Sequence, residues 1–163
     1  MLYGLLACSP KEKLQDILIN EPFMKKVAEL FHSGDLKTKD EICDVYQKLA
    51  FCNEVGEMVL DFFIKFDIVE ALMSTLKDFK DLNLMNKIIR TLRCMLQFGA
   101  NAKNVAEKKY KNFVYESKSR NAMVFVLLRV PGAQATIEEL SHHENPNIRA
   151  NTEGLIANWL KSK

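Results

Sequence analysis

Residues 68–98 read IVEALMSTLKDFKDLNLMNKIIRTLRCMLQF, and the spacing of apolar side chains in this stretch decides the fold class. Apolar residues recur there every three or four positions, which places them on one face of an α-helix. They are Ile68, Leu72, Met73 and Leu76, then Met85, Ile88, Ile89, Leu92, Met95 and Leu96. A polar run separates the two groups. The stretch therefore predicts a shorter helix, a turn and a longer helix that Asn83 opens and Gly99 closes.

Capping signals predict further helices on both sides of this stretch. A helix start is favoured by Ser, Thr, Asp or Asn, by Glu three residues later, and by Pro in the first turn. Such starts occur at Ser9-Pro10-Lys11-Glu12, Asn20-Glu21-Pro22, Thr38-Lys39-Asp40-Glu41, Asn53, Asp67 and Asn145-Pro146. The segment Val124–Val130 is too apolar for periodicity to separate helix from strand. The chain as a whole is predicted to be all-α.

The predicted helices recur as pairs in which a shorter helix precedes a longer one. The pairs lie near 22–52, 67–99 and 133–161. Leu30 and Leu76 hold equivalent places about 46 residues apart, within the period of armadillo and HEAT repeats. We therefore predict stacked helical hairpins, an armadillo- or HEAT-like α-solenoid of about three repeats. An irregular helical bundle without a true repeat is the alternative.

Two segments fall outside these pairs. Residues 54–66 are predicted to form the extra first helix of an armadillo-type triplet. Residues 100–120 are rich in lysine with interleaved aromatic residues, and they predict an irregular basic connection with a helix near 104–116. The run Lys108-Lys109-Tyr110-Lys111 has a composition that attracts acidic peptides, membranes or RNA. The glutamates mixed into the segment favour a solvated loop instead.

The bulk composition fits a single globular domain spanning residues 1–163. Hydrophobic residues make up 48% and charged residues 27%, and the net charge of +2 argues against nucleic acid as the main partner. No apolar run reaches the ~18–20 residues that a membrane span needs. The cysteines are Cys8, Cys43, Cys52 and Cys94. They lack the C-x-x-C spacing of zinc and redox sites and fit a reducing compartment, so we expect a cytoplasmic or nuclear protein.

Residue patterns typical of catalysis are missing. The histidines are His32, His142 and His143. Neighbours on a helix point in different directions, so His142 and His143 are expected to serve as cap or surface residues rather than ligands of one ion. Nothing in the sequence brings Cys52 together with His32. With no glycine-rich phosphate loop and no nucleophile motif, we expect no enzyme activity, no metal and no cofactor.

Three segments resemble the armadillo repeats of importin-alpha-type proteins. They are FIKFDIVEAL at 63–72, TLRCMLQFG at 91–99 and IEELSHHEN at 137–145. The resemblance covers residues 22–160 and implies a fold of stacked helices with a groove. That family grips nuclear-localisation peptides with a ladder of Trp and Asn on its longer helices. The matching positions here are Asp44, Lys48, Arg90 and Cys94, so the ladder itself is absent.

The end of the chain resembles a second family, the TFIIS N-terminal-type helical domain. The residues that carry this resemblance are Leu140, His143, Ile148, Arg149, Leu155, Ile156 and Trp159, with Gly132 at the place of the family's glycine turn. It implies a transcription-associated domain that docks short disordered peptides. A terminal helix pair with a capping His143 and a Trp159 that covers the core is the plainer interpretation. A scaffold subunit of a larger assembly is a further alternative.

The candidate binding surface is one edge of the longer helix in residues 67–99. Arg90, Arg93 and Gln97 share this edge at positions i, i+3 and i+7, and it would line the concave groove of an armadillo stack. Arginine suits an interface because its planar fork binds carboxylates. Five further residues are predicted to continue the surface: Asp44, Gln47, Lys48, Arg149 and Asn158. A solvated helix face is the simpler alternative. On the groove interpretation, the chain is a non-enzymatic adaptor for a peptide or protein partner, with its oligomeric state left open.

Overall fold

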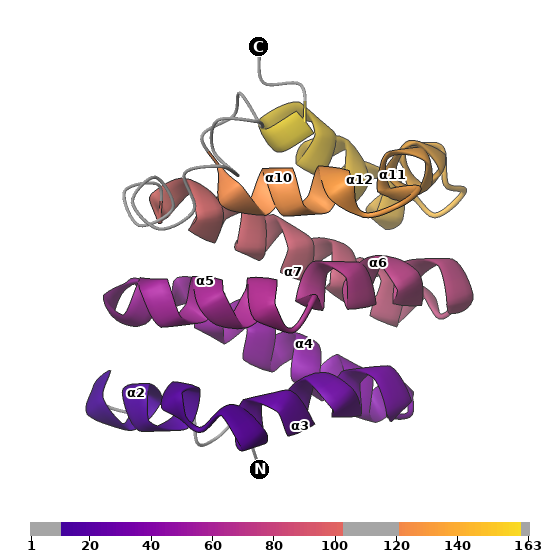
Figure 1. Ribbon diagram of the computed structural model, residues 1–163. Coiled ribbons are helices and arrows are strands. Elements are labelled where there is room, and N and C mark those ends of the chain that lie inside the picture. The colour runs from indigo at the N-terminus through magenta and orange to yellow at the C-terminus, as the bar shows by residue number, and fades with distance from the viewer. Residues whose placement is uncertain (1–10, 103–120, 161–163) are drawn as a thin grey trace.

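The computed structural model describes residues 11–102 and 121–160, and the regular elements of these residues are all helices (Figure 1). The elements are α2 (Lys11–Ile19), α3 (Glu21–Ser33), α4 (Leu36–Phe51), η1 (Asn53–Val55), α5 (Gly56–Lys65), α6 (Ile68–Asp78), α7 (Leu82–Asn101), α10 (Ala122–Arg129), α11 (Ala133–Ser141), α12 (Pro146–Leu155) and η2 (Ile156–Leu160). The all-α prediction is confirmed for these residues. The predicted Ser9-Pro10 capping box, the helix near 104–116 and the Lys108–Lys111 run lie outside them.

Several helices begin where a side chain can accept the free N–H groups of the first turn. Asn20 accepts from the Phe23 N–H at 3.1 Å, and Asn145 accepts from the Asn147 N–H at 3.0 Å, so both predicted starts are confirmed. The start predicted at Thr38 is wrong. Asp35 accepts from the Thr38 N–H at 2.8 Å, and α4 begins at Leu36. An upstream carboxylate lets the helix begin earlier.

Helix α7, the longest of the described helices, extends beyond its predicted bounds at both ends. Asp81 rather than Asn83 caps its start, accepting from the Leu84 N–H at 2.8 Å. The helix also passes through Gly99 and ends at Asn101. Gly99 does not end the helix. It allows α10 to pack closely on α7, because a Cβ at Gly99 would lie 2.9 Å from the Met123 Cβ at the start of α10.

The other predicted starts need smaller corrections. Asn53 opens the short 3₁₀ turn η1 instead of capping α5. Asp67 precedes α6 with a left-handed backbone (φ 50°) and no side-chain cap, so it turns the chain between α5 and α6. The ambiguous segment Val124–Val130 is helical as far as Arg129, because Asn121 caps α10 and α10 packs against α6, α7 and α11.

The helices contact one another in three rows (Figure 1). The long helices α4, α7 and α12 form one row, in which α7 contacts both α4 and α12. The shorter helices α3, α6 and α11 form a second row with α6 in the middle. Helices α2 and α5 contact each other in a third row. Each row therefore joins helices that are distant in sequence. Figure 1 shows the helices stacked from α2 and α3 at one end to α11 and α12 at the other. None of the described helices is long and apolar enough to cross a membrane.

An aromatic cluster joins α3, α4, α5 and α7 in the core. Tyr46 lies at its centre, with ring centroids 5.8 Å from Phe31, 5.9 Å from Phe62 and 6.3 Å from Phe63. The Tyr46 hydroxyl is buried and finds no hydrogen-bond partner among the described residues. Phe98 of α7 joins the cluster through Phe63, with ring centroids 5.9 Å apart, and such ring pairs add to the packing of these helices.

A buried lysine links α3 to α4. Lys39 is only 2% exposed, and its Nζ donates to the backbone carbonyls of Phe31 and His32, the latter at 2.9 Å. These carbonyls belong to the last turn of α3, where helix carbonyls lack partners and a cation is favoured. Burial lowers the pKa of Lys39. The sequence had placed Lys39 in a polar capping box, so its structural role was not predicted.

Candidate functional site

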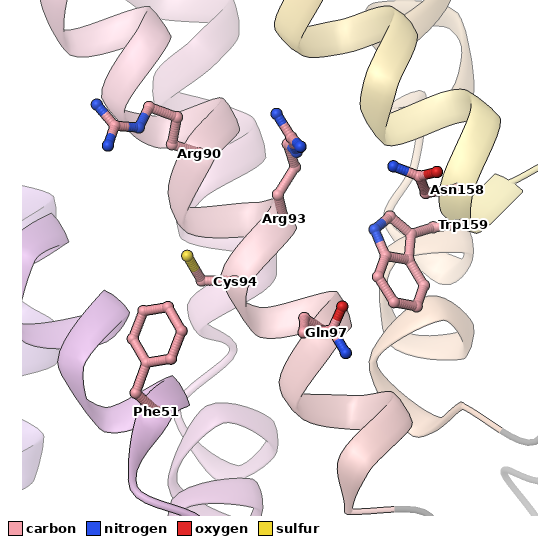
Figure 2. Close-up of a pocket in the computed structure, with 7 residues that line it drawn as sticks. All are labelled: Phe51, Arg90, Arg93, Cys94, Gln97, Asn158 and Trp159. Carbon is pink, nitrogen blue, oxygen red and sulfur yellow. The ribbon is translucent and has the colours of Figure 1, made fainter.

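A pocket of about 340 Å³ lies where the row of long helices meets η2 (Figure 2). Its lining residues come from the end of α4, the middle of α7, and η2: Phe51, Arg90, Arg93, Cys94, Gln97, Asn158 and Trp159. Four of the eight predicted site residues are among them, namely Arg90, Arg93, Gln97 and Asn158. The helical spacing on α7 had placed the first three together, and the packing of α12 on α7 brings the fourth to them.

The other predicted residues lie outside this pocket. Asp44 pairs with Lys87 at 2.8 Å, and Gln47 donates to the Thr91 hydroxyl at 2.9 Å. Arg149 is exposed near the start of α12 and donates to the His143 carbonyl at 3.2 Å. Lys48 is half-buried on α4. Asp44 and Gln47 therefore hold α4 against α7, whereas Arg149 fixes the turn before α12.

The α4–α7 contact contains a polar seam. Lys87 of α7 reaches Asp40 at 2.6 Å as well as Asp44, and the Thr91 hydroxyl donates to the Lys87 carbonyl. Burial by itself lowers the pKa of Lys87, but the two carboxylates outweigh it and the pKa is raised. The charge of Lys87 is thus neutralised within the fold.

Arg93 is oriented by α12. Its Nη1 donates to Oδ1 of Asn151 at 3.2 Å, and the Asn151 amide donates to Asn86 at 3.3 Å. The guanidinium also lies over Gly154, where a Cβ would stand 3.7 Å from it. That distance is an ordinary van der Waals contact, so Arg93 packs against the α12 backbone at Gly154. Arg93 therefore bridges α7 and α12 with part of its fork.

Arg90 has no such anchor. It is exposed, and it makes no hydrogen bond or ion pair with any residue of 11–102 or 121–160. Arg93 likewise has no carboxylate partner within that part of the chain. The described residues that line the pocket include two guanidinium groups and no acidic side chain. Unlike Lys87, these cations are not neutralised by the described residues.

Two aromatic side chains flank α7, and the sequence prediction of the site omitted both. Phe51 ends α4 and is 69% exposed, and Trp159 is half-buried in η2. Figure 2 shows them on opposite sides of α7. The sequence did contain one indication that Phe51 is exposed. Phe51 does not lie on the face of α4 that buries Ile42, Tyr46 and Leu49. No sequence signal indicated that η2 would carry Trp159 to α7.

The element η2 is a π-helix of five residues. A π-turn holds more residues than an α-turn, so it changes the direction of the side chains that follow, and such turns are frequent at functional sites. Asn158 and Trp159, the two pocket residues from the end of the chain, both lie in η2. The last segment therefore lines the pocket in a π-helical conformation.

Cys94 forms part of the floor between the arginines and Gln97 (Figure 2). Burial raises the pKa of the Cys94 thiol and outweighs the nearby Arg90 and Arg93, which lower it. The thiol is therefore protonated at neutral pH and offers a neutral, polarisable surface.

The histidines and the cysteine that the sequence analysis considered for catalysis or metal binding are not arranged as a site among the described residues. His143 accepts the Asn145 N–H on Nδ1 at 3.0 Å in the turn before α12, as expected for a cap residue. His32 lies in the last turn of α3, and Cys52 follows α4, whose 16 residues span about 24 Å, so the two lie far apart. Among the described residues, no group of three His, Cys, Asp or Glu side chains has a metal-binding arrangement.

The residues of the TFIIS-type resemblance pack α11 against α12. Leu140, Ile148 and Leu155 are buried in the core, and Gly132 takes a left-handed backbone (φ 75°) before α11. Comparison with protein-family models gave no match, and a search of curated proteins gave no significant match. Both family resemblances remain predictions from the sequence.

Proposed function

We propose that this chain is a non-enzymatic protein-interaction module that binds a peptide or protein partner on the surface of α4, α7 and α12. The observation that carries the proposal is the pocket on this surface, in which Arg90 and Arg93 have no carboxylate partner among residues 11–102 and 121–160, and two aromatic residues flank them. Arginine and aromatic side chains dominate the binding energy of many protein interfaces. A partner that supplies the missing carboxylate gains charge-assisted hydrogen bonds.

The proposal includes a solenoid of about three armadillo-type repeats, composed of α2–α4, α5–α7 and α10–α12. The three rows of contacts support it, since each row joins helices of equivalent rank in successive repeats. The longest helix of each repeat then lies in the row that contains the pocket. Such stacks present an extended surface made from equivalent helices, which is how repeat proteins bind partners.

We place this adaptor in the cytoplasm or nucleus. Cys43, Cys52 and Cys94 are free thiols, and Cys43 is fully buried. Free buried thiols fit a reducing compartment, in which a repeat domain is stabilised by its core rather than by disulfides.

Site-specific photocrosslinking in native extract tests the proposed surface. The photoreactive analogue benzoylphenylalanine replaces Phe51, which is exposed and lines the pocket. A matched variant carries it at Leu128, an exposed apolar residue of α10 outside the pocket. We expect a discrete protein partner crosslinked from position 51 and not from position 128. No discrete crosslink from 51, or the same products from both positions, would contradict the proposed surface.

A further inference from the structure

We propose that the pocket binds an extended segment of a partner protein through an Asp or Glu side chain and an apolar side chain two residues away. This inference rests on the proposed function, because it specifies the partner chemistry of the same surface. It predicts the pattern acid-x-apolar, or its reverse, in the bound segment.

The pocket has a cationic end and an apolar end. Arg90 and Arg93 lie at one end, and the aromatic Phe51 lies toward the other, with the amide of Gln97 at the same level of α7 (Figure 2). Gln97 already donates to Asn101 at 3.2 Å, so its amide is partly satisfied within α7. An anion is therefore favoured at the arginine end, and an apolar group is favoured between the aromatic residues.

The separation of the two ends sets the spacing in the ligand. The midpoint of Arg90 and Arg93 and the midpoint of Cys94 and Gln97 are separated by about 6 Å of helix at a rise of 1.5 Å per residue. In an extended peptide, side chains on one face are two residues, or about 6.6 Å, apart. One acidic and one apolar side chain at i and i+2 therefore match the pocket. A volume of about 340 Å³ lies in the range of small binding sites and accommodates two side chains.

The available donors favour a single carboxylate over a phosphate dianion. Arg93 already donates Nη1 to Asn151, and Lys87, the preceding cation on α7, is paired with Asp40 and Asp44. The pocket therefore offers the whole fork of Arg90 and part of the fork of Arg93. A planar carboxylate is satisfied by one such fork, whereas a phosphate presents more charge and more acceptor oxygens.

The chain contains one tryptophan, and Trp159 lines the pocket, so its fluorescence reports on this site. The probes are capped heptapeptides without Trp or Tyr that carry Asp-Ser-Phe or Phe-Ser-Asp in a Gly/Ser background. We expect at least one order to give a saturable change in Trp159 emission. The matched peptide with Asn in place of Asp should bind at least about tenfold more weakly, since it lacks the charge-assisted hydrogen bonds.

Variants of the protein assign the binding to the arginines. Arg90→Glu is the first choice because Arg90 is exposed and makes no hydrogen bond or ion pair with another described residue. This substitution should weaken binding of the Asp peptide at least about tenfold. Arg93→Gln keeps an amide near Asn151 and should also weaken binding of the Asp peptide. The control, Lys26→Glu, makes the same change in charge on the exposed face of α3 and should leave affinity unchanged.

The outcomes separate this inference from the proposed function. A crosslinked partner at position 51, together with equal or absent binding of the Asp and Asn peptides, would overturn the acid-x-apolar assignment and leave the binding surface intact. Binding of a phosphoserine peptide in preference to the Asp peptide would also overturn it. Peptide binding that Arg90→Glu and Arg93→Gln leave unchanged would place the ligand elsewhere.

Discussion

Arg93 of α7 donates a hydrogen bond to Asn151 of α12 across 58 positions of sequence, at 3.2 Å. This contact fixes one of the two pocket arginines and ties the last helices to the centre of the fold. It also explains why Arg93 is half-buried while Arg90 is exposed. The pocket and the packing of α12 therefore depend on the same side chains.

We expect Asn151→Ala to destabilise the protein by about 1 kcal/mol, because it removes hydrogen bonds to Arg93 and Asn86 at a partly buried position. Asn147→Ala is the matched control, since the exposed Asn147 lies one turn earlier on α12 and should change stability by less than about 0.5 kcal/mol. Urea unfolding of both variants measures the difference. Equal stability of the two variants would show that the bridge between α7 and α12 contributes nothing.

Two glycines in helices should respond in opposite ways to alanine. Gly99→Ala should destabilise by about 1–3 kcal/mol, because the new Cβ would lie 2.9 Å from the Met123 Cβ and would also clash with Asn121. Gly154→Ala should stabilise by up to about 1 kcal/mol through helix propensity, since its Cβ would meet Arg93 at an ordinary 3.7 Å. Thermal unfolding distinguishes them. A stabilised Gly99→Ala would contradict the close approach of α10 to α7.

Tyr46→Phe is expected to leave stability unchanged or to raise it by up to about 1 kcal/mol. The buried hydroxyl has no hydrogen-bond partner among the described residues, so its removal relieves the cost of burying a polar group. Tyr46→Ala should cost about 3–5 kcal/mol, because it empties the centre of the aromatic cluster. Guanidinium unfolding of the pair tests this. A clear loss of stability in Tyr46→Phe would indicate that the hydroxyl is hydrogen-bonded.

Lys39→Met should destabilise the protein by about 1–3 kcal/mol at neutral pH. The change removes charge-assisted hydrogen bonds to the Phe31 and His32 carbonyls and leaves these two carbonyls at the end of α3 without the lysine donor. Lys37→Met is the control at an exposed position of the same helix and should have little effect. Denaturant unfolding compares the two, and equal effects would contradict the capping role.

The same lysine gives a prediction about pH. Because burial lowers the pKa of Lys39 below its usual 10.5, the unfolded chain holds this proton at pH values where the folded chain has released it. The stability of the wild type relative to Lys39→Met should therefore rise as pH increases from the lowered pKa to about 10.5. A difference that stays constant through this range would contradict the lowered pKa.

The sequence predicted those features that depend on the order of residues along one helix. Apolar spacing identified the all-α class, and the edge containing Arg90, Arg93 and Gln97 follows from the helical repeat alone. Asn20 and Asn145 predicted two helix starts correctly because an N-cap is a local hydrogen bond. These properties need only the geometry of an α-helix.

The tertiary structure decided which polar side chains hold helices together and which remain on the surface. Asp44 and Gln47 looked like surface residues, but the packing of α4 on α7 pairs them with Lys87 and Thr91. Packing also buries Lys39 and leaves no space for a side chain at position 99, where the chain has glycine. The pairings of Asp44 with Lys87 and of Gln47 with Thr91 join residues more than 40 positions apart, and no local pattern records them.

The pocket shows both contributions. Its α7 edge was determined by the sequence alone, because residues at i, i+3 and i+7 share a helix face in any fold. Phe51 reaches that edge from α4, and Trp159 reaches it from η2, which continues α12 on the other side of α7. The sequence determined which cations α7 presents, and the packing of neighbouring helices decided that aromatic side chains flank them and that no described carboxylate neutralises them.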